Sequence, residues 1–239
     1  CPIATNTAPQ SRRERAPVRV ASIAEWQPIL GQVASVPGVV AAAATVNGSA
    51  FASRGSATKA VSLRGVEAEA YDRIVAVGSK LVAGEFRLTG NDAVIGTGLA
   101  SELGLEVGDK LRVAADGGRN EVFTVAGVFD LGNKDVNQRW LFVPLRPAQN
   151  LLDLPGSIST IEVRVADYLE ADAAAQLIAA RTGLLAESWT QLNRQLLVAL
   201  RSQSASSYMI QFFVIVAVAL GIASVLAVSV VQKSREIGI

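Results

Sequence analysis

The chain has 239 residues, of which half are apolar and 18% are charged, and its 22 basic and 21 acidic residues nearly cancel. This composition excludes global intrinsic disorder, which requires low hydrophobicity and high charge, and it lacks the basic excess typical of a nucleic-acid binder. Histidine is absent and Cys1 is the one cysteine, so zinc sites and histidine-dependent catalytic triads lose their essential residues. We therefore expect no enzyme, no cofactor, no metal site and no nucleic-acid partner.

The N-terminal segment, residues 1–17, is polar, contains three prolines and is predicted to be a linker. Because the chain starts with Cys1 and not with methionine, we interpret it as a piece of a longer protein, with a lipidated Cys1 as the alternative. Ser22 and Glu25 have the spacing of a capping box for a first helix, although Pro28 could itself mark the helix start. Pro37-Gly38 would end that helix.

The following segment alternates strand and helix patterns. Two strands are predicted around a turn at Gly55, a short helix follows, and the turn Asp116-Gly117-Gly118 predicts a hairpin between two further strands. The predicted strands are 39–51, 59–66, 110–115, 121–129, 140–143, 158–165 and 184–186, and the predicted helices are 98–103 and a segment from Asp167 and Glu170 to the stop at Gly183. Strands interrupted by helices indicate an α+β domain with two lobes, which we assign to residues 18–188.

Residues 189–208 predict an amphipathic stalk helix. Leu192, Leu196 and Leu200 recur at helical spacing with polar residues between them, and no proline or glycine follows before Gly221. The simplest prediction is one long helix that continues into the next segment, and a plain tether is the alternative.

The segment 209–231 is the most apolar part of the chain. No Asp, Glu, Lys or Arg occurs between Arg201 and Lys233, and a helix of this length would span roughly 34 Å, enough for a hydrocarbon core of about 30 Å. We therefore predict one transmembrane helix, with a buried core helix as the alternative. Ala219, Ala223 and Ala227 lie at i, i+4 and i+8, which would let another transmembrane helix pack closely.

Basic residues follow this segment at once. Lys233 and Arg235 favour a cytoplasmic C-terminus, although Arg201 before the span weakens the bias. Residues 1–208 would then be extracytoplasmic, and 232–239 would begin a cytoplasmic region.

The remaining motifs match known chemistry poorly. The chain contains no Walker A loop, and Ser56-x-x-Lys59 has the spacing of serine acyl enzymes without their partner motifs. Asp130, Asn133 and Asp135 could bind a cation, but they lack EF-hand spacing, and a solvated loop is the preferred interpretation.

Several short stretches nevertheless occur in a familiar order, and together they resemble the permease subunits of lipoprotein-releasing ABC transporters of the LolC/LolE type, within the MacB/FtsX-like permease superfamily. The stretches are Leu-Arg-Gly-Val at 63–66, Val-Ile-Gly-Thr-Gly-Leu-Ala at 94–100, Leu-Gly-Leu-Glu-Val-Gly-Asp-Lys-Leu at 103–111, Phe-Val-Pro-Leu at 142–145, Ile-Glu-Val-Arg at 161–164, Ser-Trp at 188–189 and Lys-Ser-Arg-Glu-Ile-Gly-Ile at 233–239. The resemblance covers roughly residues 20–239.

The resemblance implies a two-lobed MacB-like periplasmic core domain, with a first transmembrane helix before residues 1–17 and further spans after the last residue. It also implies an ABC ATP-binding subunit, a second permease subunit and membrane lipid as partners, with a lipoprotein as possible cargo. The family's cytoplasmic coupling region, which meets the ATPase subunit, matches Lys233, Arg235, Glu236, Ile237 and Gly238.

One departure from the family pattern concerns cargo handover. Permeases of the LolC type carry a long loop that recruits a periplasmic carrier, whereas the matching connection here is the tight Asp116-Gly117-Gly118 turn. A LolE-like subunit or a general FtsX-like exporter therefore fits better than a carrier-binding subunit. The alternatives are a non-transporting FtsX-like transmitter that regulates an extracytoplasmic partner, and a single-pass membrane-anchored binding domain.

Overall fold

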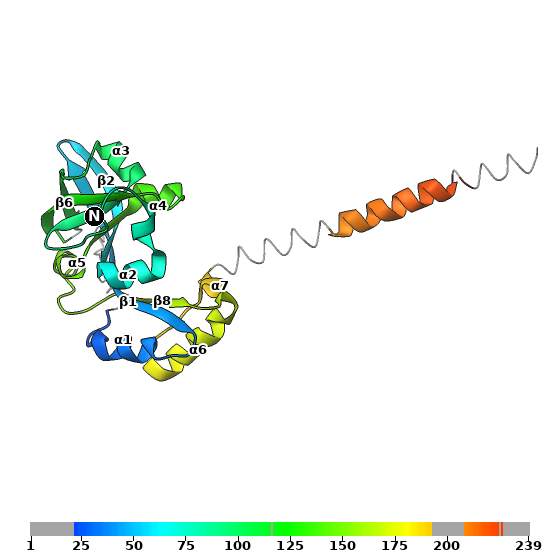
Figure 1. Cartoon of the computed structure of the whole chain (residues 1–239), viewed down its shortest axis with the longest axis horizontal. Helices are drawn as coiled ribbons and strands as arrows, with labels where there is room; N and C mark the ends of the chain where they lie inside the picture. Colours follow the sequence, from blue (N-terminus) through cyan, green and yellow to red (C-terminus); the bar gives the residue numbers. More distant parts are fainter. Residues whose placement is uncertain (1–21, 116, 193–207, 225, 227–239) are drawn as a thin grey trace, which may run out of the picture. The chain divides into compact units, whose positions relative to one another are not determined.

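The structure is a computed structural model, and it describes residues 22–115, 117–192, 208–224 and 226 (Figure 1). The chain divides into two compact units, Cys1–Tyr168 and Leu169–Ile239. In chain order the first unit contains α1 (Trp26–Ala34), β1 (Val39–Arg54), β2 (Ala57–Val66), α2 (Ala68–Val75), the 3-10 helix η1 (Val77–Lys80), β3 (Leu81–Gly84), β4 (Asp92–Gly96), α3 (Thr97–Leu103), β5 (Lys110–Ala115), β6 (Asn120–Phe129), α4 (Lys134–Arg139), β7 (Trp140–Pro144), α5 (Leu145–Leu151) and β8 (Thr160–Val165).

Six strands of the single described sheet close on themselves, and we call them the ring. Going round, β1 pairs with β2, β2 with β7, β7 with β4, β4 with β6, β6 with β5, and β5 again with β1. The β2–β7 and β4–β6 pairs are parallel and the others antiparallel. β3 adds to β6, and β8 adds to β1 outside the ring.

Side chains alternate between the inside and the outside of the ring, as the pleat of a strand requires. In β5, Leu111 and Val113 are fully buried in the inner core, whereas Lys110 and Arg112 are exposed. The same alternation places Phe123 and Leu141 inside. Burying this apolar set gives the ring its own core.

A second, aromatic core lies on the outer side of β7, β4 and β2. Phe142 is its centre, because the rings of Tyr71, Phe86, Phe129 and Trp140 all lie within 5.4–5.9 Å of its ring centroid. Tyr71 comes from α2, and η1 adds the buried Val77. The excursion between β2 and β4 therefore closes one outer side of the ring.

The long strand β1 changes partners along its length. Residues 39–45 pair with β8, and we call this two-stranded piece the ribbon, while residues 50–53 pair with β5. Between them the Ser159 hydroxyl takes the place of a strand, since it accepts from the Asn47 N–H at 3.2 Å and donates to the Asn47 carbonyl at 3.4 Å. Gly48 lies in this gap, and a Cβ there would come within 2.5 Å of Leu152.

The second unit begins inside the 3-10 helix η2 (Tyr168–Glu170) and continues with α6 (Ala171–Thr182), α7 (Trp189–Leu192) and a helix over residues 208–224. Gly183 ends α6 in the left-handed conformation with φ 68°. Asp172 accepts hydrogen bonds from the Ser188 hydroxyl and, at 2.7 Å, from the Thr190 hydroxyl, which fixes α7 to α6.

Most predicted elements of the α+β domain are confirmed, including the hairpin, the strands at 39–51 and 59–66 and the helix ended by Gly183. Two predictions are wrong. The capping box predicted Ser22 as the N-cap and Glu25 at position N3. Glu25 is instead the N-cap, in a left-handed conformation, and its side chain forms no capping hydrogen bond. Residues 184–186 form no strand, and Leu185 is 88% exposed. Most of the predicted stalk, residues 193–207, lies outside the described residues, and the division into two lobes stays a prediction.

Candidate functional site

The residues predicted to couple to an ATPase, Lys233, Arg235, Glu236, Ile237 and Gly238, lie outside the described residues, as does Ala227. Ala219 and Ala223 fall on the helix over 208–224, and both are exposed. The predicted transmembrane packing face is therefore described only in part.

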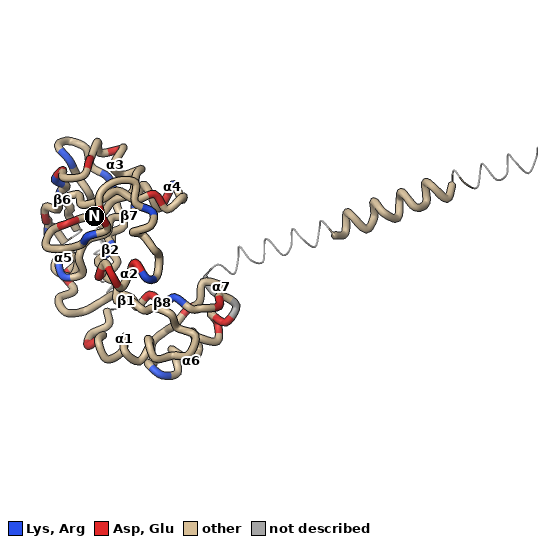
Figure 2. Tube along the Cα trace, in the orientation of Figure 1, with Lys and Arg blue, Asp and Glu red and all other residues tan. Residues whose placement is uncertain are grey.

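The helix over 208–224 is apolar on every side and exposed along its whole length. Phe212 and Phe213 are each 63% exposed, and all other residues of the helix are exposed as well. The helix contains no Lys, Arg, Asp or Glu, whereas charged residues are scattered over the first unit (Figure 2). An all-apolar helix is stable only in apolar surroundings, so this helix needs a partner of that kind.

Within the residues that the structure describes, no helix has both the length and the apolar character needed to cross a membrane. The predicted span 209–231 extends past this part, since residue 225 and residues 227–231 are outside it.

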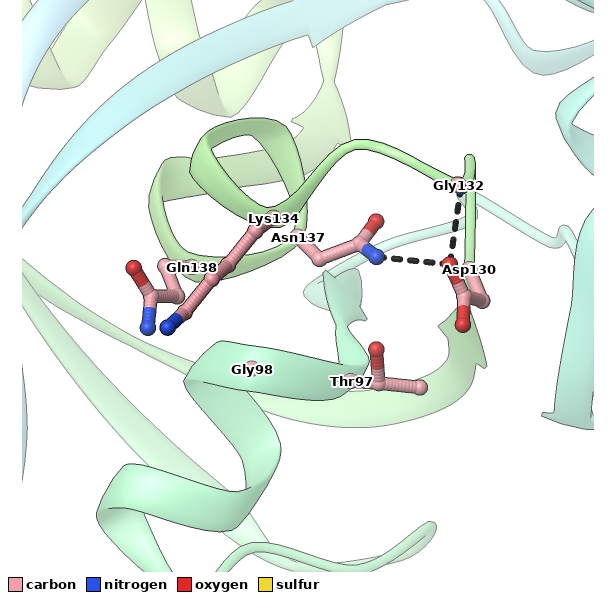
Figure 3. Close-up of a pocket in the computed structure, with 7 residues that line it drawn as sticks. All are labelled: Thr97, Gly98, Asp130, Gly132, Lys134, Asn137 and Gln138. Carbon is pink, nitrogen blue, oxygen red and sulfur yellow. Dashed lines mark hydrogen bonds between the residues drawn. The ribbon is translucent and has the colours of Figure 1, made fainter.

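A polar pocket of about 350 Å³ opens on the first unit between the start of α3 and the loop from β6 to α4 (Figure 3). Asp130 closes that loop by accepting from the Gly132 N–H at 2.8 Å and from the Asn137 amide at 2.6 Å. Asn137 is buried, and its side-chain Oδ1 accepts from the Leu131 N–H at 3.0 Å. Lys134 also lines the pocket.

The hydrogen bonds from Gly132 and Asn137 hold the pKa of Asp130 below its usual value. The preferred interpretation of this segment from its sequence is a solvated loop, with a cation site as the alternative; Asp130 closes the loop, and Asn133 caps α4 by accepting from the N–H groups of Asp135 and Val136. In the described parts of the chain, no group of three acidic or cysteine ligands is placed to hold a metal ion. The pocket is thus a surface hollow beside a loop that the hydrogen bonds of Asp130 and Asn137 hold closed.

A second polar cluster, which sequence analysis missed, lies beside the aromatic core. Arg64 of β2 forms an ion pair with Glu162 of β8, and its guanidinium carbon lies 4.1 Å from the centroid of the Trp140 ring and 5.8 Å from that of Tyr71. Burial and the nearby charge of Glu162 raise the pKa of Tyr71 well above its usual value of 10.0. An arginine between leucine and glycine in a strand gives no sequence signal for such a cluster.

The β5–β6 hairpin is as tight as its sequence predicts. The Ala115 N–H donates to the Arg119 carbonyl at 2.9 Å, and the Gly118 N–H donates to the Ala115 carbonyl at 3.0 Å. Arg119 then pairs with Asp153 at 2.6 Å. This connection is therefore short and contains no projecting loop.

Comparison with known proteins defines the class of this fold. The family model of the MacB-like periplasmic core domain matches residues 4–181, well over half of the chain. The chain belongs to the MacB-like periplasmic core domain family.

Particular relatives agree with this assignment. The chain is 28% identical over 230 residues to the lipoprotein-releasing system transmembrane protein LolC of Neisseria meningitidis serogroup B. The aligned region covers 90% of this chain and 55% of LolC. The chain thus spans about half the length of this relative. The resemblance inferred from the short motifs is confirmed.

Two solved structures are also similar. The periplasmic region of MacB from Actinobacillus actinomycetemcomitans has a TM-score of 0.50 and 13% identity, over 71% of this chain and 81% of that one. This likeness supports the fold. The extracellular domain of the noncanonic ABC-type transporter YknZ from Gram-positive bacteria has a TM-score of 0.49 and 18% identity, over 70% of this chain and 87% of that one.

Proposed function

We propose that the chain is part of a permease subunit of an ABC transporter, in which ATP hydrolysis by a separate subunit changes the conformation of an extracytoplasmic core domain. One observation carries the proposal: a MacB-like core domain is followed in the same chain by an apolar helix over residues 208–224 whose residues are all exposed. A membrane supplies the apolar surroundings that this helix lacks.

The membrane placement rests on charge and hydropathy. Residues 209–231 form the transmembrane helix, 189–208 the stalk that leads to it, and 1–208 lie outside the cytoplasm. Lys233 and Arg235 hold the C-terminus in the cytoplasm, because basic residues next to a span stay on that side. The protein is then an inner-membrane protein of a bacterium.

The coupling and assembly roles follow from the family resemblance. Lys233, Arg235, Glu236, Ile237 and Gly238 contact the ATP-binding subunit, and the face of Ala219, Ala223 and Ala227 packs on a second permease subunit. The cargo is an amphiphilic molecule such as a lipoprotein, in keeping with the name of the relative LolC.

The tight hairpin favours a second candidate for the external step. Because the Ala115–Arg119 turn has no projecting loop, this subunit lacks the element with which a LolC-type permease would hold a carrier. A LolE-like role fits this, and so does an FtsX-like transmitter, which uses the same membrane machinery to switch an extracytoplasmic partner without moving cargo.

Single introduced cysteines test the membrane placement. In a Cys1→Ser background, Ser101→Cys on the exposed end of α3 and Ser234→Cys after the span are labelled in intact cells with a membrane-impermeant maleimide. We expect labelling at position 101 and none at 234 until the membrane is permeabilised. Equal labelling of both in intact cells contradicts the placement.

Reconstitution of the full-length permease with its ATP-binding subunit tests the coupling. We expect Glu236→Lys and Gly238→Trp to abolish ATP-driven release of a lipoprotein from proteoliposomes, while the surface variant Asp109→Asn keeps it. Release that persists in both coupling variants overturns the assignment. ATP hydrolysis that alters the core domain without moving any lipoprotein favours the transmitter.

A further inference from the structure

The ribbon connects the ring to the rest of the chain. β1 starts directly after α1, and β8 is the last strand before the second unit begins at Leu169. The ring starts where the ribbon ends, because Thr45 pairs with Thr160 of β8 on one side and with Val66 of β2 on the other. Any displacement passed along the chain from the second unit therefore reaches the ring through the ribbon.

An ion pair between Arg64 and Glu162 joins the ribbon to the ring. Arg64 belongs to the ring strand β2 and Glu162 to β8, and their side chains are 13% and 23% exposed. The flat guanidinium stacks on Trp140, which restricts where Arg64 can point. A largely buried pair of this kind adds little net stability, because the desolvation of both charges offsets their attraction.

The groups around Arg64 are incompletely paired. Among the described residues, Asn47 Oδ1 and Arg64 Nε are buried side-chain atoms without a hydrogen-bond partner. Asn47 is directly opposite Arg64 in the β1–β2 register, and Tyr71 lies under the guanidinium. These groups are complementary, since Arg64 Nε can donate to Asn47 and the Tyr71 hydroxyl can donate to Glu162.

We propose that Asn47, Arg64, Tyr71 and Glu162 form a two-position joint between the ribbon and the ring. In the arrangement described here Arg64 holds Glu162. In the second arrangement Arg64 turns to Asn47 and the Tyr71 hydroxyl remains the donor to Glu162, so the ribbon shifts against the ring while each of the two separated charges keeps a neutral hydrogen-bond partner. Unpaired buried groups cost free energy in the first arrangement, which keeps the second within reach.

The backbone beside the joint is built to bend. One edge of β1 pairs with β8 up to Thr45 and with β5 from Ala50 onward. Between these two residues that edge has no strand partner, and the Asn47 N–H donates to the Ser159 hydroxyl instead. A single side-chain bridge is easier to remake than a ladder of backbone hydrogen bonds. The hinge of β1 and the exchange of Arg64 partners therefore lie at the same place.

Hydrogen–deuterium exchange of the full chain in detergent micelles tests the joint without any transport assay, so its failure is distinct from failure of the proposed transporter. We expect Glu162→Gln to speed exchange in the ribbon, residues 39–45 and 160–165, by at least about tenfold, while ring amides at 122–129 stay within about twofold. Asp109→Asn is the matched control, because Asp109 forms an ion pair with Arg54 at 2.8 Å that is more exposed, at 33% and 40%, and lies away from the joint.

Two substitutions of Asn47 separate the joint from a merely structural role. Asn47→Asp offers Arg64 a charged competitor and should speed ribbon exchange with Glu162 intact, whereas Asn47→Ala removes the second partner and should slow it. Opposite effects support the joint. Effects of the same sign, or equal acceleration of the ring and the ribbon in Glu162→Gln, overturn it.

Discussion

The ring and the helix over 208–224 use the same aliphatic residues in opposite ways. In the ring, Leu111 and Val113 alternate with charged neighbours and are fully buried, so the strands supply their own apolar surroundings. In the helix, Val214 and Ile222 are 54% and 57% exposed, and no polar face interrupts the apolar surface. The spacing of apolar residues along the segment, and not their number, decides whether they can be buried within the domain or need apolar surroundings from outside it.

The largest expected difference between the two regions comes from introducing two arginines into each of them. We expect Val216→Arg with Leu220→Arg to prevent membrane insertion, because each arginine near the centre of a span costs about 3 kcal/mol. Phe51→Arg with Val122→Arg on the exposed outer side of the ring should leave insertion and folding unchanged. Alkaline extraction of membranes measures the difference, and equal extraction of the two double variants would refute it.

Removal of the central aromatic ring should cost nearly as much inside the first unit. Phe142 is fully buried and contacts four other rings, so Phe142→Ala should lower the free energy of unfolding by about 3–5 kcal/mol. Phe51→Ala, at a position that is 48% exposed, should cost about 1 kcal/mol or less. Denaturant unfolding followed by tryptophan fluorescence compares them, and similar midpoints would show that Phe142 is not central.

A methyl group at a close contact should have a smaller effect. A Cβ on Gly96 would come 2.2 Å from the backbone oxygen of Asn137, so α4 must move in Gly96→Ala, at a cost of about 1–3 kcal/mol. Gly117 has nothing within 4 Å of such a Cβ, and Gly117→Ala is the control. The fold near the pocket would be looser than described if both variants melted at the wild-type temperature.

The last expected effect arises only at alkaline pH. Because the folded protein raises the pKa of Tyr71 above its ordinary value of 10.0, the stability tied to the neutral hydroxyl is present below pH 10 and is lost as pH rises toward the folded value. Unfolding free energy should fall by about 1.4 kcal/mol per pH unit in that window from this group. Tyr71→Phe should remove this slope, and an unchanged slope would place the hydroxyl in water.

Sequence patterns predicted the elements whose signals are local. The Asp116-Gly117-Gly118 turn specified the β5–β6 hairpin, and Gly183 specified the end of α6. Short helices such as α2 and α4 were missed, because packing and caps such as Asn133 hold them in place and their own sequence does not. The predicted strand at 184–186 failed because an apolar run forms a strand only with a partner.

Closure of the ring could not be predicted. It depends on the parallel pairs β2–β7 and β4–β6, which join residues that are distant in the sequence and leave no mark in the local pattern. The joint was missed for the same reason, since Arg64 and Glu162 meet only after β8 has paired with β1. The α+β class followed from local patterns, and the resemblance to permeases added the family to which the fold belongs.

Fractionation of bacteria that express this chain tests most directly whether the segment 209–231 lies in lipid while the core domain lies in water. The membrane assignment predicts that the chain sediments with the membranes and is released as a folded monomer or dimer only by detergent. A chain that stays in the supernatant as a monodisperse monomer without detergent would contradict it.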